Sequence, residues 1–250
     1  MRLEIRDLCF SYPKQETIKN VSFTAVDGDI VAILGVNGVG KSTMLKCINK
    51  VHKPKSGRII LDGKNLLDMK TNEIAKVVGY VAQYGQFGEG SVFDNVLLGR
   101  KPFIKWDISA NDLDIVNNVI KSVGLDHLAD RNIDKLSGGE RQKVAICRAL
   151  AQQTPVLMFD EPTSNLDVKN QLEVLNVIKD IVLNNKLIAL ISIHDINLAL
   201  RYANKFLLLK NGEVYLYGDE SIITKESVKN IYGVDCEIST FKGHKYVIID

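Results

Sequence analysis

Residues 30–48 read "IVAILGVNGVGKSTMLKCI" and carry the clearest structural signal in the chain. The stretch opens with a short, continuous apolar run, which is typical of a strand buried on both faces of a parallel sheet. The run leads into the loop "GVNGVGKST" (35–43), and a helix is predicted to follow. The residues that match the pattern G-x-x-x-x-G-K-[ST] are Gly35, Gly40, Lys41 and Ser42. The stretch therefore predicts a phosphate-binding loop between a strand and a helix.

Each part of this loop has a chemical use. Backbone N–H groups and the N-terminus of the following helix would surround the phosphates of a nucleotide. Lys41 would place a positive charge on the β and γ phosphates, and the Ser42 hydroxyl can bind Mg²⁺. Glycine is needed where the backbone turns sharply or approaches the ligand. We therefore expect a bound nucleotide together with Mg²⁺.

A second buried strand, "PVLMFDEP" (155–162), ends in two neighbouring carboxylates, Asp160 and Glu161. One carboxylate can hold Mg²⁺, usually through water, while the other can orient and deprotonate an attacking water. Beside a phosphate loop, we interpret the pair in this way rather than as the solvated entry to a loop. The pair predicts hydrolysis of the nucleotide.

Two further strand ends carry polar side chains, and an aromatic residue precedes the phosphate loop. His194 follows "LIALISI" and Gln83 closes "GYVAQ". Because the carboxyl ends of parallel strands face one crevice, His194 is interpreted as a γ-phosphate contact that positions water. Gln83 is interpreted as a sensor of Mg²⁺ or water that joins the core to a helical lobe. Tyr12 is expected to stack on adenine, with a core tyrosine as the ordinary alternative.

A second candidate anion site lies in "LSGGERQKVAICRAL", residues 136–150. Ser137, Gly138 and Gly139 offer a hydroxyl and unhindered N–H groups at the start of a helix. One triphosphate does not need two such sites from one chain. The sequence therefore predicts a dimer with a two-fold axis, in which each ATP contacts the phosphate loop of one copy and "LSGGE" of the other. ATP would close the dimer, and hydrolysis would weaken it.

The pattern of elements predicts an α/β protein. Strands and helices alternate before residue 84 and after residue 150, whereas helical periodicity dominates between them, which predicts an α/β core with an inserted helical lobe. Thr71 is predicted to cap a short helix, and Asn211-Gly212 to form a hairpin turn. In the tail, 220–250, a helix is expected between Thr224 and Gly233, followed by two strands around Lys242-Gly243.

The composition is that of an ordinary globular protein. The 250 residues carry a formal net charge of +2, so no nucleic-acid partner is expected. The cysteines are far apart and form no CxxC motif, which favours buried free thiols in a reducing compartment; they are Cys9, Cys47, Cys147 and Cys236. No apolar run reaches the roughly 18 residues needed to cross a bilayer, and the N-terminus does not resemble a signal peptide. We expect a soluble protein that can still dock on a membrane protein.

Taken together, these residues resemble the nucleotide-binding subunit of an ABC transporter over about residues 1–219. The resemblance implies a single ABC ATPase domain, 1–250, with a P-loop NTPase (RecA-like) core and an N-terminal antiparallel β subdomain. It assigns residues 1–83 and 151–219 to the α/β core and 84–150 to an inserted α-helical subdomain with the signature motif. Residues 220–250 are left as a C-terminal extension.

The resemblance also assigns the site. "GVNGVGKST" matches Walker A, Gln83 the Q-loop, "LSGGE" the signature, "VLMFDE" Walker B, "SNLD" (164–167) the D-loop and His194 the switch histidine. The implied nucleotide contacts are Tyr12, Gly35, Asn37, Gly38, Gly40, Lys41, Ser42, Thr43, Ser137, Gly138, Gly139, Glu140 and Asp167. The implied catalytic residues are Glu161, as the base, with His194, Gln83 and Lys41. The implied Mg²⁺ ligands are Ser42, Gln83 and Asp160.

A narrower resemblance is to the ATPases of importers for iron chelates (siderophore, haem) and cobalamin. It implies a separate membrane permease that contacts the segment Tyr84–Lys105, with an extracytoplasmic substrate-binding protein acting indirectly. Phe87 and Phe93 in this segment would face the permease or else form the core of the helical lobe. The subunit would be cytoplasmic, peripheral on the inner face of the cell membrane. The alternatives are a soluble ABC ATPase outside transport, for example in iron–sulfur assembly, and a regulator without turnover, against which Glu161 and His194 argue.

Overall fold

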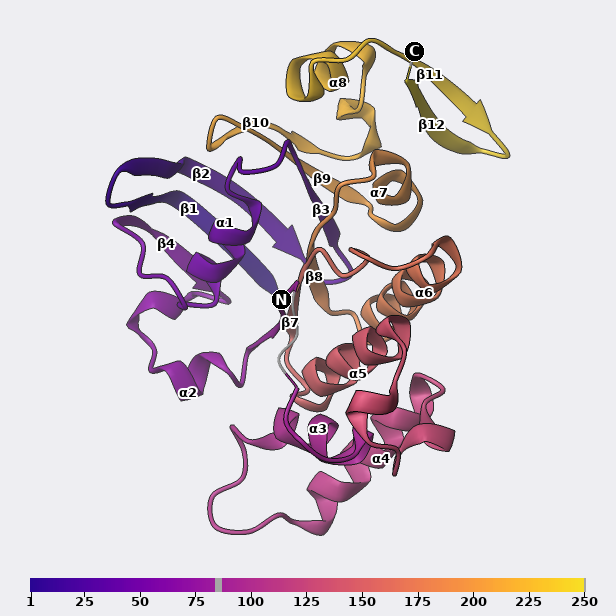
Figure 1. The fold of residues 1–250 in the computed structure, drawn as a ribbon. Helices are drawn as coiled ribbons and strands as arrows, with labels where there is room; N and C mark the ends of the chain where they lie inside the picture. Colours follow the sequence, from indigo (N-terminus) through magenta and orange to yellow (C-terminus); the bar gives the residue numbers. More distant parts are fainter. Residues whose placement is uncertain (84–86, 250) are drawn as a thin grey trace. The chain divides into compact units, whose positions relative to one another are not determined.

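The computed structural model describes residues 1–83 and 87–249 of the chain. It divides into two compact units (Figure 1). The first unit combines Met1–Met69 with Val182–Asp250, and the second is Lys70–Ile181. The first unit thus contains the phosphate loop, and the second contains the signature sequence.

The N-terminal part of the first unit is an antiparallel sheet in the order β2-β1-β4-β5. Its strands are β1 (Arg2–Tyr12), β2 (Gln15–Val26), β4 (Ser56–Leu61) and β5 (Lys64–Asn65). Buried and exposed residues alternate along much of β1 and β2, as expected for strands with one face on a core. The predicted antiparallel β subdomain is confirmed.

A second sheet of the first unit contains β3 (Ile30–Leu34), which is the apolar run that precedes the phosphate loop. β3 pairs in parallel with β8 (Ile188–Ser192) and β9 (Lys205–Lys210), and β10 (Glu213–Gly218) adds to β9 in antiparallel fashion. Every residue of β3 and β8 is buried, which explains their unbroken apolar sequences. Helix α1 (Lys41–Ile48) follows β3, and α7 (Ile196–Tyr202) follows β8.

The C-terminal extension completes the first unit. It contains η5 (Glu220–Ile222), α8 (Lys225–Tyr232), β11 (Cys236–Phe241) and β12 (His244–Ile249). The Thr224 side chain caps α8, and Gly233 ends it with a φ of 74° in the left-handed region. The predicted helix and both predicted strands of this tail are confirmed.

The second unit contains a parallel pair of strands and a helical lobe. β6 (Val78–Val81) pairs with β7 (Val156–Asp160). The helices are α2 (Thr71–Ile74), α3 (Val92–Leu97), η2 (Leu98–Arg100), α4 (Ala110–Ser122), η3 (Asp126–Leu128), η4 (Ile133–Lys135), α5 (Gly138–Ala151) and α6 (Val168–Asn184), the last of which ends in the first unit. The lobe has its own apolar core from α3, α4 and α5, which includes Val96, Val116, Ile120, Val144 and Cys147.

A buried ion pair ties this lobe together. The Arg100 guanidinium donates from Nε to Asp112 Oδ1 at 2.8 Å and from Nη1 to the carbonyl of Ala151 at 2.7 Å. Ser109 and Arg100 together hold the pKa of the Asp112 carboxyl below its ordinary value. The pair therefore joins the end of η2 to the start of α4 and the end of α5.

One predicted helix cap is wrong by one residue. Helix α2 begins at Thr71 itself, and its N-cap is Lys70. The Glu73 carboxylate accepts a hydrogen bond from the Lys70 N–H at 2.8 Å, which replaces the cap that a Thr71 hydroxyl would have supplied.

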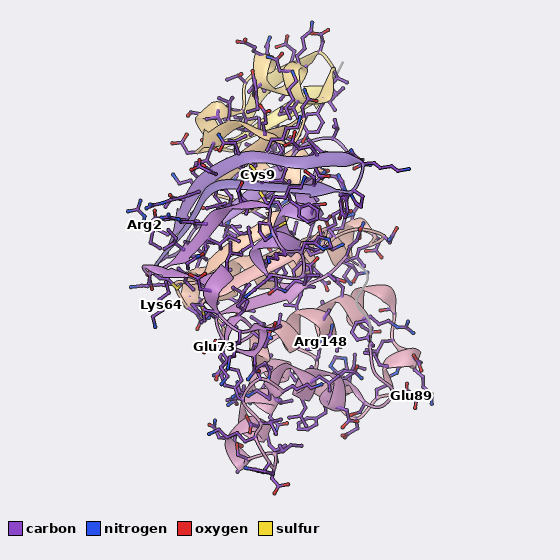
Figure 2. All side chains as sticks on the ribbon, turned by 90° about the vertical axis from the view of Figure 1, so that its left-hand side faces the viewer. Arg2, Cys9, Lys64, Glu73, Glu89 and Arg148 are labelled. Carbon is purple, nitrogen blue, oxygen red and sulfur yellow. The ribbon has the colours of Figure 1, made fainter. Side chains whose placement is uncertain are left out.

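The cysteines are free, as predicted. Cys47, Cys147 and Cys236 are buried, whereas Cys9, labelled in Figure 2, is half-buried on β1. Burial raises the pKa of Cys47 and of Cys147 to about 12, so these thiols are unreactive near neutral pH. Within the part of the chain that the structure describes, no helix combines the length and the apolar character that crossing a bilayer requires.

Candidate functional site: a phosphate loop and a carboxylate cluster

The phosphate loop depends on glycine at its junction with α1. Gly40 is the N-cap of α1 and has a φ of 113°, a conformation that other residues rarely adopt. A Cβ atom at this position would lie 2.7 Å from Ile18 Cδ1 and 3.0 Å from the carbonyl oxygen of Thr17. The backbone of the loop therefore lies too close to β2 for any side chain at residue 40.

The start of α1 presents its backbone donors without a side-chain cap. No described side chain accepts a capping hydrogen bond at Gly40, and the first turn contains no acidic residue. The Lys41 side chain is 4% exposed, and its ammonium donates to the carbonyls of Gly35 (2.8 Å) and Val36 (3.2 Å). The positive end of the helix and a buried ammonium thus lie at the same loop, which favours an anion there.

A pocket of about 560 Å³ borders the same loop. Residues 36–39 form one wall, and the start of β2, the β9–β10 turn and Ile231 form the others. Lys19 and Lys210 contribute positively charged groups to the lining, and Glu16 contributes a carboxylate. The volume is within the range of small-molecule sites.

Tyr12 lies near the beginning of α1. Its ring is 41% exposed, and its hydroxyl is 3.4 Å from Thr43 Oγ1 and 3.2 Å from His52 Nε2. Phe10 supports the ring edge-on at 5.0 Å between centroids. A ring exposed to this extent is not a core tyrosine, so it keeps a face for stacking. His52 was not predicted from the sequence, because nothing in "KVHKPK" marks it as a neighbour of Tyr12.

His194 is exposed in the turn between β8 and α7. The next residue, Asp195, caps α7 by accepting hydrogen bonds from the N–H groups of Asn197 (2.7 Å) and Leu198 (3.0 Å). His194 therefore follows the carboxyl end of a buried strand, as predicted.

In the second unit, Asp160 is the last residue of β7 and is 2% exposed. The Tyr80 hydroxyl donates to Asp160 Oδ2 at 3.2 Å. Burial, with the neighbouring carboxylate, raises the pKa of Tyr80 far above its ordinary value, so the hydroxyl stays protonated and can donate. Sequence reasoning missed Tyr80, since it lies inside β6, but the parallel register of β6 with β7 accounts for the contact.

Glu161 has a φ of 50°, in the left-handed region that non-glycine residues rarely occupy. Its carboxylate accepts a hydrogen bond from Gln83 Nε2 at 2.5 Å. Backbone conformations of this kind persist where the surroundings hold them, often at functional sites. The structure thus brings together two residues that are 78 positions apart and that the sequence predicted separately as catalytic.

The signature sequence forms a closed capping box at the start of α5. Ser137 Oγ accepts from the Glu140 N–H at 3.3 Å, while the Glu140 carboxylate accepts from the Ser137 N–H at 2.7 Å and hydroxyl at 2.8 Å. These bonds from Ser137 hold the pKa of Glu140 below its ordinary value. Ser137 and Gly138 are exposed. The helix start is present as predicted, and it is capped by its own side chains.

Gly139 and Asp167 meet through Asn170, which the sequence analysis did not single out. A Cβ atom on Gly139 would lie 2.5 Å from Asn170 Oδ1. Asp167 accepts hydrogen bonds from the N–H (2.8 Å) and the side-chain amide (3.0 Å) of Asn170. The signature and the D-loop are therefore linked through Asn170 within one chain. The predicted nucleotide contact of Asp167 stays a prediction.

The predicted permease segment is described from Phe87 onward, so Tyr84 lies outside the described residues. Phe87 and Phe93 are half-buried against the core of the helical lobe. The guanidinium of Arg148, labelled on α5 in Figure 2, lies over the Phe87 ring at 5.6 Å. Both aromatic residues thus pack against the core of the lobe, and their contact with a permease stays a prediction.

Comparison with known proteins identifies a family. The family model described as "ABC transporter" matches residues 18–164. Over 248 residues the chain is 46% identical to the uncharacterised ABC transporter ATP-binding protein MJ0089 of Methanocaldococcus jannaschii, covering 99% of this chain and 98% of that one. It is 33% identical to the petrobactin import ATP-binding protein FpuD of Bacillus anthracis, covering 95% and 89% of the two chains.

Solved structures agree with this likeness. One, from a transporter provisionally described as an ABC transporter of the metal-chelate type in an inward-facing conformation, has a TM-score of 0.85 at 29% identity and covers 99% of this chain and 96% of its own. Another is a dimeric, post-hydrolysis state of the ATP-binding cassette MJ0796 with ADP and Pi. Its TM-score is 0.74 at 28% identity, with 87% and 98% of the two chains covered. The predicted P-loop NTPase fold is confirmed.

Proposed function

The chain belongs to the ABC transporter family as an ATP-binding, ATP-hydrolysing subunit, and on this premise we propose that it drives the uptake of an iron-chelate or cobalamin-type substrate through a separate membrane permease. It would act as a head-to-tail homodimer. The relatives with assigned roles support this direction, since one of them is an import protein for petrobactin. A soluble ATPase outside transport is not favoured by these relatives.

The contact that carries the proposal is the hydrogen bond between Gln83 and Glu161. Glu161 is the carboxylate expected to take a proton from the attacking water. Gln83 is the last described residue before the segment predicted to contact the permease. A movement of that segment would therefore shift Gln83, which donates a hydrogen bond to the base Glu161. In this way the conformation of the permease would affect the rate of hydrolysis.

The residues of the phosphate loop would bind and orient ATP. Backbone N–H groups at Gly40 and the Lys41 ammonium would neutralise the phosphates, with further contacts from Asn37, Gly38 and Thr43. Tyr12 would stack on adenine, and His194 would orient the γ-phosphate. To reach the phosphates, the Lys41 ammonium would exchange its bonds to the carbonyls of Gly35 and Val36.

Mg²⁺ would be held by Ser42, Asp160 and Gln83. Within the described residues, no cluster of three or more His, Cys, Asp or Glu side chains could hold a metal ion. Mg²⁺ in nucleotide sites is commonly bound through one or two carboxylates together with phosphate oxygens and water. This donor set supplies one carboxylate, from Asp160, and two neutral oxygens, so it fits. Because Gln83 uses its nitrogen on Glu161, its amide oxygen is the atom that suits the metal. When bound, Mg²⁺ would offset the charge that develops on the phosphates.

The dimer would use the signature residues Ser137, Gly138 and Gly139 on the nucleotide held by the other copy. Glu140 and Asp167 would act at the same contact. The dimeric cassette with ADP and Pi supports two copies per functional unit. The permease would contact exposed residues of the segment Tyr84–Lys105 and place the subunit at the inner face of the membrane.

Replacement of Glu161 by Gln tests the catalytic part of the proposal. The variant should lose Mg²⁺-dependent ATPase activity by a factor on the order of a hundred or more, because the general base is removed. ATP binding, measured by fluorescence of a nucleotide analogue, should be retained, and the dimer with ATP should persist. An ATPase rate equal to that of the wild type would contradict the role of Glu161.

The transport part requires the natural membrane partners. The subunit should co-purify with an integral permease, and the reconstituted complex should take up radiolabelled substrate with ATP. Ferric siderophores, haem and cobalamin would be compared in parallel. Active ATPase without any of these activities and without a co-purifying permease would support the non-transport alternative.

A further inference from the structure

The C-terminal extension (residues 220–250) contacts the rest of the first unit through α8 and β12, among other described elements. Helix α8 packs beside β9 and β10, where Asn230 Nδ2 donates to the Tyr215 hydroxyl oxygen at 2.9 Å. Strand β12 packs beside α7 (Figure 1). The second contact involves α7, which begins at Ile196 just after the cap Asp195, so it can affect the position of His194.

This second contact is a two-way hydrogen-bond pair made by Asn197. Its side-chain Nδ2 donates to the Val247 carbonyl at 3.0 Å, and the Val247 N–H donates to Asn197 Oδ1 at 2.8 Å. Val247 is 4% exposed, so its main-chain groups have little water available as a replacement partner. The Asn197 side chain thereby provides a hydrogen-bond partner for both the N–H and the carbonyl of Val247 on β12.

The backbone of Asn197 takes part in the cap of α7, because its N–H donates to Asp195 Oδ1 at 2.7 Å. The first turn of α7 is therefore held between the cap at Asp195 and the strand at Val247. His194 is the residue that immediately precedes this cap. A movement of this turn away from β12 would break the pair with Val247, and His194 would move with the turn.

The extension reaches the phosphate loop as well. Ile231 lines the pocket whose wall includes residues 36–39. The Tyr232 hydroxyl is buried near the backbone of Gly35 and the carboxylate of Asp195, without a hydrogen bond of ordinary geometry among the described residues. Burial raises the pKa of Tyr232 to about 12, so this hydroxyl is neutral at physiological pH. The same extension thus contacts the two segments that are expected to meet the γ-phosphate.

We propose that Asn197 is a positioning residue, which ties the first turn of α7 to β12 and so holds His194 where ATP turnover needs it. Through this contact, the C-terminal extension affects the rate of hydrolysis rather than the affinity for ATP. This inference rests on the proposed role of His194.

The test compares Asn197→Ala and Asn197→Asp with wild type. Asn197→Asp keeps the size of the side chain and one acceptor, but it places a carboxylate oxygen against the Val247 carbonyl. Both variants should lower kcat about tenfold, as expected from the loss of one or two neutral hydrogen bonds. KM for ATP should change less than about twofold, because ground-state binding is not touched. Asn230→Ala is the matched control: it removes an amide contact of the same extension, and kcat should stay unchanged.

A double-mutant cycle separates positioning from a general loss of stability. In the His194→Ala background, Asn197→Ala should have no further effect on the residual turnover, measured with excess enzyme in single-turnover assays. Multiplicative effects, or a wild-type kcat in both Asn197 variants, would overturn the positioning role and leave the proposed function intact. A wild-type rate for His194→Ala alone would instead contradict the proposed role of His194.

Discussion

The two glycine-containing helix starts of this chain have opposite designs. At the start of α1, the N-cap is Gly40, and no described side chain caps the helix. At the start of α5, Ser137 and Glu140 satisfy each other in a closed capping box. The first start has a glycine in place of a capping side chain, whereas the second is capped by its own side chains. The difference supports the proposal that α1 binds the nucleotide of its own chain, and that α5 meets a nucleotide bound by the other copy.

The largest expected effect comes from Gly40→Ala. The new Cβ would be forced into a left-handed conformation and against Ile18 and Thr17, so the loop must shift. ATP affinity should fall by roughly a hundredfold or more, equivalent to about 2.7 kcal/mol. Equilibrium binding of a fluorescent ATP analogue measures this loss. If the affinity for ATP were unchanged, the start of α1 would not be the nucleotide-binding helix start.

The matched change at the other helix start, Gly138→Ala, should be harmless to the fold. Its Cβ would meet only Leu166 Cδ2 at 4.0 Å, and Ala is a better helix former than Gly. ATP binding to the monomer and the thermal midpoint should be unchanged or slightly raised, while ATPase activity at dimer-forming concentrations should fall. Full activity would show that no nucleotide approaches Gly138 closely.

Ser137→Ala should have two smaller, separable effects. Loss of the N-cap should lower the free energy of unfolding by about 1 kcal/mol, measured by urea denaturation. Loss of a hydroxyl donor to the phosphates should lower turnover on the order of tenfold to a hundredfold. Ser137→Thr is the control, since it keeps the hydroxyl and should keep most of both functions. A loss of stability with unchanged turnover would show that Ser137 caps α5 and does not contact the phosphates.

The smallest effect concerns pH. The pKa of Glu140 is lowered in the folded protein, so its capping bonds stabilise the fold above the ordinary carboxyl pKa of 4.5 and are lost as pH falls through the folded pKa. The difference in unfolding free energy between wild type and Glu140→Gln should therefore shift in favour of the variant as pH drops below about 4.5. Denaturation curves at several pH values measure it, and a pH-independent difference would contradict the capping role of the charge.

The sequence predicted the structure best where a motif and the pattern of apolar residues indicate the same element. The buried strand β3, the phosphate loop and α1 follow directly from the apolar run and the glycine spacing. The caps at Thr224 and Gly233 and the turn at Asn211-Gly212 were likewise predicted, since each depends on residues within a few positions. Thr71 was misassigned because Glu73 supplies an equivalent cap from inside the helix.

The missed contacts are those between residues far apart in the chain. The bond from Gln83 to Glu161 and that from Tyr80 to Asp160 arise from the pairing of β6 with β7, which no local pattern reveals. The pairing of Asn197 with Val247 depends in the same way on where the C-terminal hairpin packs. The sequence therefore identified the candidate site residues, but it did not identify the residues with which they form hydrogen bonds.

The central claim is that each ATP lies between the α1 start of one copy and the α5 start of the other. Heterodimers purified with two different tags test it most directly. A pair of Lys41→Ala and Ser137→Ala chains contains one intact composite site, so it should recover about half the wild-type ATPase rate. A pair of wild type with a Lys41→Ala/Ser137→Ala chain places one defect in each composite site and should be nearly inactive. The reverse ranking of the two pairs would show that each site is complete within one chain and would contradict the account.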